Sequence, residues 1–276
     1  MLLRRLPSKT RELLAVLLLA VFVIIVAIWW SRGHQNPIDN LQKKPAPSSS
    51  NLAAGDSPVA PQFNKKQHSI NDPVSLWAIV NKGRILPTTY VPTGLTAPNI
   101  ALRLGTSAPE MRLRQDAASA LEQMDKAAQI QGLRFMLASG HRSYAFQSSL
   151  YSGYVRQMGQ TAADSSSARP GHSEHQTGLA ADVEPSNRKC EINVCFAQTP
   201  EGKWLALNSY KYGFIIRYGP GKDSLTGYEY EPWHLRYVGS ELATQLYQND
   251  QTIEQFFNLP AMTQYPARAF TLGPGS

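Results

Sequence analysis

The sequence predicts an α+β domain in which helices flank a small antiparallel sheet, preceded by one transmembrane helix. Its 276 residues contain helical and short strand-like segments that follow one another without the regular βαβ alternation of a parallel sheet. A long uncharged apolar run lies near the N-terminus, and the stretch after it is too rich in Pro and Ser to form a core. We therefore expect a single folded domain at residues 73–262, without internal repeats.

Three segments have the residue pattern of helices. Between residues 109 and 131, with Pro109 in the first turn, apolar side chains recur every three or four positions and predict an amphipathic helix that faces the core with Leu113, Ala117, Leu121, Met124 and Ala128. Residues 144–157 and 204–212 are expected to form two further helices. The serine-rich stretch 159–170 is expected to be a mobile loop.

Four short apolar segments have the composition of strands, at residues 133–138, 180–184, 214–217 and 233–238. In the last of these, alternation places His234 and Arg236 on one face of the strand and Trp233 and Tyr237 on the other. We expect the aromatic face to pack and the histidine face to look into a cleft.

Residues 13–30 form an uncharged apolar run that would span about 27 Å as a helix, which is enough to cross a bilayer. Four Lys or Arg residues precede the run and only Arg32 follows it closely, so the positive-inside rule keeps residues 1–12 in the cytoplasm. We expect a single-pass protein of the cell membrane with its folded domain outside. A cleaved secretory signal is the alternative, but such signals have shorter apolar centres and a small-residue cleavage site that is missing after Trp30.

The composition of the flanks predicts a flexible linker at residues 31–72 and a C-terminal tail at residues 263–276. The formal charge of +7 lies mostly in the N-terminal flank: residues 1–72 hold nine Lys or Arg against four Asp or Glu, which gives +5 and leaves +2 for the rest. The basic balance is therefore poor evidence for nucleic-acid binding, and no nucleic-acid partner is expected.

The chain has two cysteines, Cys190 and Cys195. In an oxidising exterior, two thiols this close in the sequence are expected to form a disulfide across a small loop. Two alternatives remain: half of a metal site, which would need two further ligands nearby, or two free buried thiols.

Three motifs supply the residue types of a catalytic zinc site: SGHRSY at residues 139–144, SEHQTGLAAD at 173–182, and EPWH at 231–234. Catalytic zinc takes three protein ligands and leaves a fourth position for water, while another carboxylate accepts the proton. We expect Zn²⁺ to be bound by His175, Asp182 and His234, with Glu231 as the general base.

The spacing between His175 and Asp182 is too long for one helical turn, but it suits a loop that leads into a strand. Glu184 is the substitute ligand if the assignment of Asp182 is wrong, because it would share the same side of the strand. His172 is expected to be an ordinary polar residue. Glu174 is expected to be either a solvated charge or a partner that orients a ligand.

In this order, the three motifs resemble those of the zinc-dependent D-alanyl-D-alanine carboxypeptidases of the VanY type and their L,D-carboxypeptidase relatives. The resemblance covers roughly residues 75–260. It implies a zinc carboxypeptidase that removes the terminal D-alanine from peptidoglycan stem peptides, with D,D- and L,D-specificity both open. We expect this enzyme to be extracytoplasmic, because of the N-terminal apolar run, and monomeric. A zinc endopeptidase of the same fold and a non-catalytic cell-wall-binding module are the alternative functions.

The chemistry of its side chain suggests a role for Arg142, and the same resemblance implies roles for Gln147 and Ser173. Arg142 would bind either the C-terminal carboxylate of the substrate or the oxyanion that forms at the scissile carbonyl, since its planar guanidinium suits both. Gln147 and Ser173 match positions that help to hold the terminal D-alanine in relatives. Tyr144, from the first motif, is a weaker candidate for the same task.

Overall fold

The computed structural model describes residues 63–274. They belong to one compact unit that begins at Phe63, and this unit alone is considered below. The predicted transmembrane run at residues 13–30 and most of the predicted linker lie outside the described residues. Between residues 63 and 274, no helix is long and apolar enough to cross a membrane.

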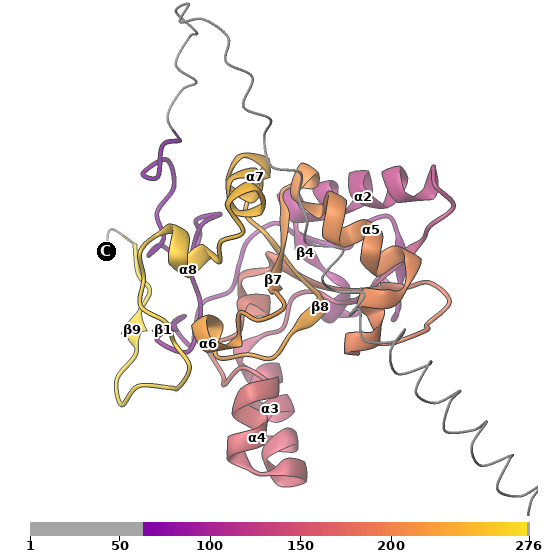
Figure 1. Ribbon diagram of the computed structural model, residues 1–276. Helices are drawn as coiled ribbons and strands as arrows, with labels where there is room; N and C mark the ends of the chain where they lie inside the picture. The colour runs from indigo at the N-terminus through magenta and orange to yellow at the C-terminus, as the bar shows by residue number, and fades with distance from the viewer. Residues whose placement is uncertain (1–62, 275–276) are drawn as a thin grey trace, which may run out of the picture. The chain divides into compact units, whose positions relative to one another are not determined.

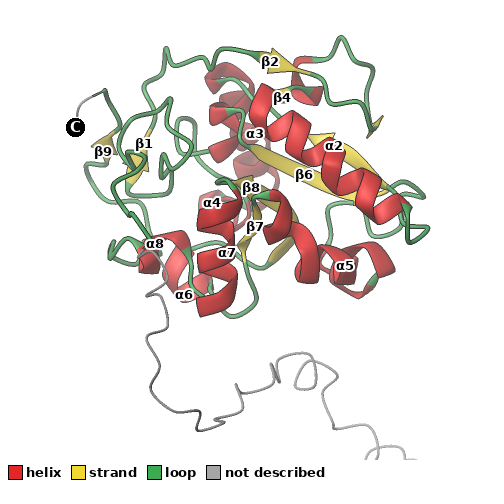
Figure 2. Cartoon of the chain, turned by 90° about the horizontal axis from the view of Figure 1, so that it is seen from above, coloured by secondary structure: helices red, strands yellow, loops and turns green. Residues whose placement is uncertain are grey.

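A five-stranded mixed sheet forms the centre of the domain, in the order β3-β5-β6-β8-β7. The first pair is parallel and the other three pairs are antiparallel, so the prediction of a purely antiparallel sheet was wrong for β3. The strands are β3 (Ala101–Leu102), β5 (Phe135–Ser139), β6 (Ala180–Pro185), β7 (Phe214–Tyr218) and β8 (Glu231–Tyr237). The four segments predicted as strands are confirmed to within two residues, and helices flank the sheet as expected (Figure 2).

The sheet buries one face against helix α2 (Gln115–Gln129), which lies across it beside β6 (Figure 2). Side chains from four strands join this hydrophobic core, including Leu137, Val183, Phe214 and Leu235. Because side chains alternate along a strand, the neighbours of the core residues point to the opposite face. That alternation leaves polar residues of β6 and β8 free to build a site on the other side of the sheet.

Helix α2 begins later than predicted. It buries most of the expected stripe, but Pro109 starts a short 3-10 helix, η2 (Pro109–Met111), and Leu113 belongs to strand β4 (Leu113–Arg114). Strand β4 pairs with β2 (Leu95–Thr96) in an antiparallel ladder. The long-range pairing with β2 holds Leu113 in an extended conformation, which local periodicity could not reveal.

The stretch predicted as a mobile loop, 159–170, is largely helical, and that prediction was wrong. Helix α3 (Tyr144–Met158) ends at Gly159, whose φ of +82° breaks the helix, and α4 (Gln160–Ser166) packs back against it (Figure 1). Asp164 anchors the pair, accepting hydrogen bonds from Tyr151 at 2.6 Å and from Arg169 at 2.9 and 2.7 Å. These tertiary contacts override the loop-like composition.

The predicted third helix is present but begins four residues early. Helix α5 (Pro200–Asn208) is capped by Thr199, whose hydroxyl accepts from the amide of Gly202, and a 3-10 helix continues it from Ser209 to Tyr212. The loop between β6 and α5 contains the disulfide of Cys190 and Cys195, as expected.

A second hydrophobic core lies between the N-terminal end of the described chain and its last two helices. It includes Trp77 near the N-terminal end and residues of α7 (Ser240–Asn249) and α8 (Ile253–Phe256). Phe63 stacks on Trp77 with ring centroids 5.4 Å apart. The expected linker boundary at residue 72 therefore lies too far along the chain, because residues 63–72 are part of the fold.

The expected boundary of the C-terminal tail also needs correction. Strand β9 (Phe270–Thr271) pairs in parallel with β1 (Arg84–Ile85), and Leu272 is buried. The described part of the predicted tail is thus held by backbone hydrogen bonds and a buried apolar side chain. A short helix, α6 (Asp223–Thr226), completes the elements of the fold.

Candidate metal centre

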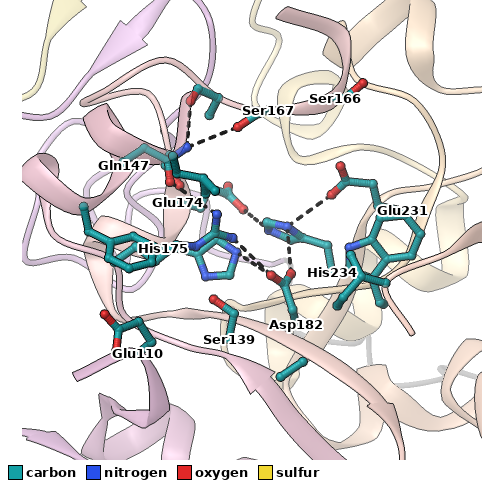
Figure 3. Close-up of a pocket in the computed structure, with 18 of the residues that line it drawn as sticks. Glu110, Ser139, Gln147, Ser166, Ser167, Glu174, His175, Asp182, Glu231 and His234 are labelled. Atoms are coloured by element: carbon teal, nitrogen blue, oxygen red, sulfur yellow. Dashed lines mark hydrogen bonds and ion pairs between the residues drawn. The ribbon is translucent and has the colours of Figure 1, made fainter. Parts of the chain in front are cut away.

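Three side chains that come from separate elements converge beneath a cavity on the polar face of the sheet (Figure 3). His175 lies in the 3-10 helix η3 (Glu174–Thr177), Asp182 in β6, and His234 in β8, where it is the direct ladder partner of Asp182. All three are buried, and one potential ligand atom from each lies within 4.8 Å of the others. The structure therefore brings together the three ligands predicted from the sequence.

The imidazole of His175 is held in one tautomer. Its Nδ1 lies 2.6 Å from the carbonyl oxygen of Gly140, and a carbonyl can only accept, so Nδ1 carries the proton. The lone pair is then on Nε2, which is 3.3 Å from Asp182 Oδ2. Glycine is needed at position 140, because a Cβ there would lie 2.4 Å from the carbonyl oxygen of Arg112.

Gly178 provides the turn between His175 and Asp182. Its φ of +71° is in the left-handed region, and a Cβ at this position would lie 2.9 Å from Leu95 Cδ2. Glycine is therefore favoured mainly by its left-handed conformation, with close packing against Leu95 as a smaller contribution. A short 3-10 helix and the turn at Gly178 lead into β6, so the strand is confirmed but the preceding residues are not an irregular loop as expected.

His234 is surrounded by three carboxylates. Its Nδ1 lies 3.4 Å from Asp182 Oδ1 and 3.3 Å from Glu231 Oε2, while Nε2 lies 3.6 Å from Glu174 Oε2. Figure 3 shows Glu174 and Glu231 approaching the imidazole from different sides. The ring also packs edge-on against Tyr218, with centroids 5.0 Å apart.

The charges around the two histidines give them opposite protonation preferences. Burial, with help from the Arg142 guanidinium, lowers the pKa of His175 to about 4. Burial also opposes a charge on His234, but the nearby carboxylates of Glu174 and Glu231 stabilise the charged ring and raise its pKa to about 9. The pKa of Asp182 is lowered despite burial, because His175 and Arg142 stabilise the carboxylate.

The donor set fits a zinc ion. Two imidazoles and one carboxylate are the ligands that catalytic zinc uses, and Nε2 of His175 and Oδ1 of Asp182 are buried without a hydrogen-bond partner. A metal between them would satisfy both atoms. Glu184, the substitute for Asp182, does not belong to this cluster, because its carboxylate is buried in an ion pair with Arg103.

Glu231 lies at the first position of β8 and lines the cavity. A strand would normally place residues three apart on opposite faces, but the pairing of β7 with β8 is irregular here. Ile216 pairs with Leu235 and Tyr218 pairs with Glu231, so two residues along β7 correspond to four residues along β8. This bulge lets the Glu231 carboxylate reach His234, and burial raises its pKa.

Arg142 reaches both the candidate metal centre and helix α3. Its Nη2 lies 3.1 Å from Asp182 Oδ2, and its Nη1 donates to Gln147 Oε1 at 3.3 Å. The Gln147 amide nitrogen donates in turn to the carbonyl oxygen of Ala168 at 2.7 Å. In this structure Gln147 therefore orients Arg142 while it lines the cavity.

The cavity has a volume of about 330 Å³, which suits a small ligand or the end of a peptide. Ser173 lines it, as does Arg142. Tyr144 is not among the described residues that line it; Phe146, Leu150 and Tyr154 do so instead, on one face of α3. This apolar helix face was not predicted from the sequence, although its four-residue spacing is visible there.

Two further functional candidates were missed or only partly foreseen. Glu174 is fully buried beside His234, so the alternative of a solvated charge was wrong and the orienting alternative stands. Arg217, which contacts Glu174, was not noted at all. The sequence did contain a sign of its role: Arg217 is a charged residue in an otherwise apolar predicted strand, and a charge that becomes buried needs a partner.

Fold and site together have the character of a metallopeptidase, and comparisons with known proteins agree. The family model for D-alanyl-D-alanine carboxypeptidase (VanY) matches residues 110–240. The putative carboxypeptidase YodJ of Bacillus subtilis is 42% identical over 189 residues, 68% of this chain and 69% of that one. The D-alanyl-D-alanine carboxypeptidase of Enterococcus faecalis is 35% identical, over 50% of this chain and about half (53%) of that protein.

Solved structures show the same likeness. The LdcB LD-carboxypeptidase has 42% identity and a TM-score of 0.65, covering 67% of this chain and 87% of that one. VanYB in complex with D-alanine-D-alanine has 31% identity and a TM-score of 0.55, and the match covers 65% of this chain and 96% of that one. A VanY mutant with the same identity and score was solved with Zn(II). This chain belongs to the zinc-dependent D-alanyl-D-alanine carboxypeptidase family of the VanY type and is a metallopeptidase.

Proposed function

We propose that this protein is a zinc-dependent carboxypeptidase that removes the terminal D-alanine from peptidoglycan stem peptides. The observation that carries the proposal is the convergence of His175, Asp182 and His234 beside Glu231 at the base of one cavity. Family relatives that act on D-alanyl-D-alanine supply the substrate class.

The three converging side chains would hold the metal through Nε2 of His175, a carboxylate oxygen of Asp182 and Nδ1 of His234. Bound zinc supplies a Lewis acid that polarises a carbonyl and lowers the pKa of water. The buried positions of all three ligands keep the site rigid and poorly solvated, which strengthens electrostatic interactions in it.

Glu231 is placed to act as general base and then as general acid. Its carboxylate faces the cavity beside His234, and its raised pKa brings it nearer to the working range of a group that must take up and release a proton. It would accept the proton of the attacking water and pass it to the departing amine of D-alanine.

Arg142 has two possible tasks, and we favour the binding of the free C-terminal carboxylate of the substrate. Arg142 lines the cavity together with Ser173, and its Nε is buried without a hydrogen-bond partner among the described residues, so a substrate carboxylate could satisfy it. The alternative is stabilisation of the oxyanion at the scissile carbonyl.

Product analysis tests the proposal. The full chain, purified with Zn²⁺, is incubated with pentapeptide and tetrapeptide muropeptides, and the products are identified by mass spectrometry. We expect loss of one terminal alanine from at least one of them, and the preferred peptide distinguishes D,D- from L,D-specificity. Cleavage inside the stem would establish an endopeptidase instead, and zinc binding without any cleavage would establish a binding module.

We also propose that residues 13–30 anchor a monomeric protein in the cell membrane, with the folded domain outside. The disulfide between Cys190 and Cys195 supports an oxidising compartment. Protease treatment of intact spheroplasts should remove the domain, and carbonate washing should leave the chain in the membrane fraction. A chain that is protected from protease, or that washes off, contradicts the proposal. Light scattering of the detergent-solubilised protein tests the monomer.

A further inference from the structure

A fully buried carboxylate, that of Glu174, lies between His234 and two arginines. Glu174 Oε1 accepts from Arg217 Nε at 2.8 Å and from Arg236 Nη1 at 3.0 Å. Glu174 Oε2 has no hydrogen-bond partner among the described residues, and neither has Nε2 of His234, 3.6 Å away. The carboxylate is thus held on one oxygen and presents the other to the imidazole.

The same arginines extend the network away from the metal centre. Arg217 donates through Nη1 and Nη2 to the two carboxylate oxygens of Glu254 at 3.1 and 2.5 Å, and Glu254 accepts from Asn81 Nδ2 at 3.1 Å. Arg236 donates through Nη2 to the backbone carbonyls of Leu76 and Ala78 at 3.0 and 2.8 Å. A continuous buried chain of contacts therefore runs from His234 to α8 and to the N-terminal segment.

The charges of this network balance. Two arginines and two glutamates are buried together, and both arginines donate to Glu174 Oε1. An ionised carboxylate is tolerated in such a place only when it is paired and hydrogen-bonded. The arrangement therefore supplies a fixed, fully charged acceptor next to Nε2 of His234.

The position of this acceptor decides which nitrogen of His234 is available to a metal. Nδ1 faces Asp182 and Glu231, on the side of the cavity, whereas Nε2 faces Glu174. A ligating histidine usually donates its other ring N–H to a carboxylate or a carbonyl, which sets its tautomer and the direction of its lone pair. His175 uses the Gly140 carbonyl for this purpose, with the opposite nitrogen.

We propose that Glu174 is a positioning residue that accepts the Nε2 proton of His234 and so directs Nδ1 at the metal, and that Arg217 and Glu254 hold Glu174 in place. Glu254 and Asn81 lie outside the segment that matches the family model, residues 110–240. The metal centre of this chain thus depends on α8 and on the segment around Asn81. The inference rests on the zinc-binding part of the proposed function and not on the substrate.

Zinc affinity, measured by competition with a chromophoric chelator, tests the positioning role. Glu174→Gln should raise the zinc Kd by about 10- to 100-fold, and Glu254→Gln should raise it by a smaller factor. Glu184→Gln is the matched control, because Glu184 is also buried and paired with an arginine but does not contact a ligand. Its zinc Kd should stay within about twofold of wild type even if its melting temperature falls.

A zinc Kd for Glu174→Gln that matches that of Glu184→Gln would reduce the network to a structural role and overturn the proposal. The melting temperature of each variant in EDTA separates weaker metal binding from lower stability of the fold. If Glu174→Gln does not fold, Glu254→Gln and the measurement on the wild type below decide the question.

The wild-type protein offers the sharpest test, since nitrogen-15 NMR of labelled histidine side chains reports the tautomer of each ring. In the zinc-loaded full chain we expect His234 to carry its proton on Nε2 and His175 to carry its proton on Nδ1. A zinc-loaded chain with the His234 proton on Nδ1 overturns this proposal alone. A chain that binds no zinc overturns the proposed function as well.

Discussion

Arg142 Nη2 lies 3.1 Å from Asp182 Oδ2, so the cation that is proposed to read the substrate also contacts a candidate metal ligand. The contact links substrate recognition to the metal centre through one guanidinium. It also explains why a buried carboxylate at Asp182 stays ionised, since Arg142 and His175 both stabilise its charge.

Glu231→Gln should keep the fold and the zinc ion while lowering kcat by at least about a hundredfold, because the amide can neither accept nor return the proton. Steady-state kinetics and metal analysis measure the two effects. Glu229→Gln is the control, since Glu229 is exposed and lies outside the cavity. A variant with near-wild-type kcat would end the assignment of Glu231 as the base, and loss of zinc would make Glu231 a ligand.

His175→Ala and His234→Ala should each abolish zinc retention, because the two remaining ligands cannot complete a zinc site. His172→Ala should keep the metal, since His172 Nδ1 bonds to the carbonyl oxygen of Asn81 at 2.8 Å and its ring packs on Tyr265. Elemental analysis after gel filtration measures the zinc content. If His172→Ala alone lost the metal, the choice between the neighbouring histidines would be reversed.

Arg142 can be tested with a double cycle of enzyme and substrate changes. If the guanidinium binds the terminal carboxylate, amidation of that carboxylate should cost wild-type enzyme about 1.5–3 kcal/mol of transition-state stabilisation. Arg142→Ala should then show little further loss with the amide, because both changes remove the same interaction. Measured kcat/KM values for the four combinations give the coupling, and additive effects would assign Arg142 to the oxyanion instead.

The metal-free protein should be most stable near pH 6.5. The pKa of His234 is raised to about 9 from an ordinary value of 6.5, so its contribution to stability is complete below pH 6.5 and is lost as pH rises through 9. The pKa of His175 is lowered to about 4, so its contribution is present above pH 6.5 and is lost as pH falls through 4.

Melting temperatures of the protein in EDTA, measured from pH 4 to pH 9, test both the acid and the alkaline loss of stability. The alkaline fall should disappear in His234→Ala, and it should also disappear at saturating Zn²⁺, since a zinc-bound imidazole is neutral in this range. A melting temperature that rises between pH 6.5 and 9 would contradict the assigned direction of the His234 shift.

Four of the five strands of the central sheet could be predicted because each carries its own local pattern, whereas the two-residue strand β3 was not predicted. Residues 180–184 and 233–238 are short apolar runs with polar residues at alternate positions, and both are strands in the structure. Helix α2 and stretch 159–170 were predicted less well. In both places contacts with distant residues decide the conformation: β4 pairs with β2, and Asp164 anchors α4 through Arg169 and Tyr151.

The sequence alone predicted the three candidate metal ligands and Glu231, because motifs that combine histidine with a nearby carboxylate are chemically specific. Only the tertiary structure decided how these residues work together. The bulge in β8 lets Glu231 reach His234, and the pairing of β6 with β8 places Asp182 directly opposite His234. Glu174 can be a buried partner of His234 because Arg217 and Arg236, both distant in the sequence, donate to its carboxylate, while Glu254 balances the second arginine charge. Such long-range charge pairing leaves no local pattern, since its energy depends on burial and on partners that only folding brings together.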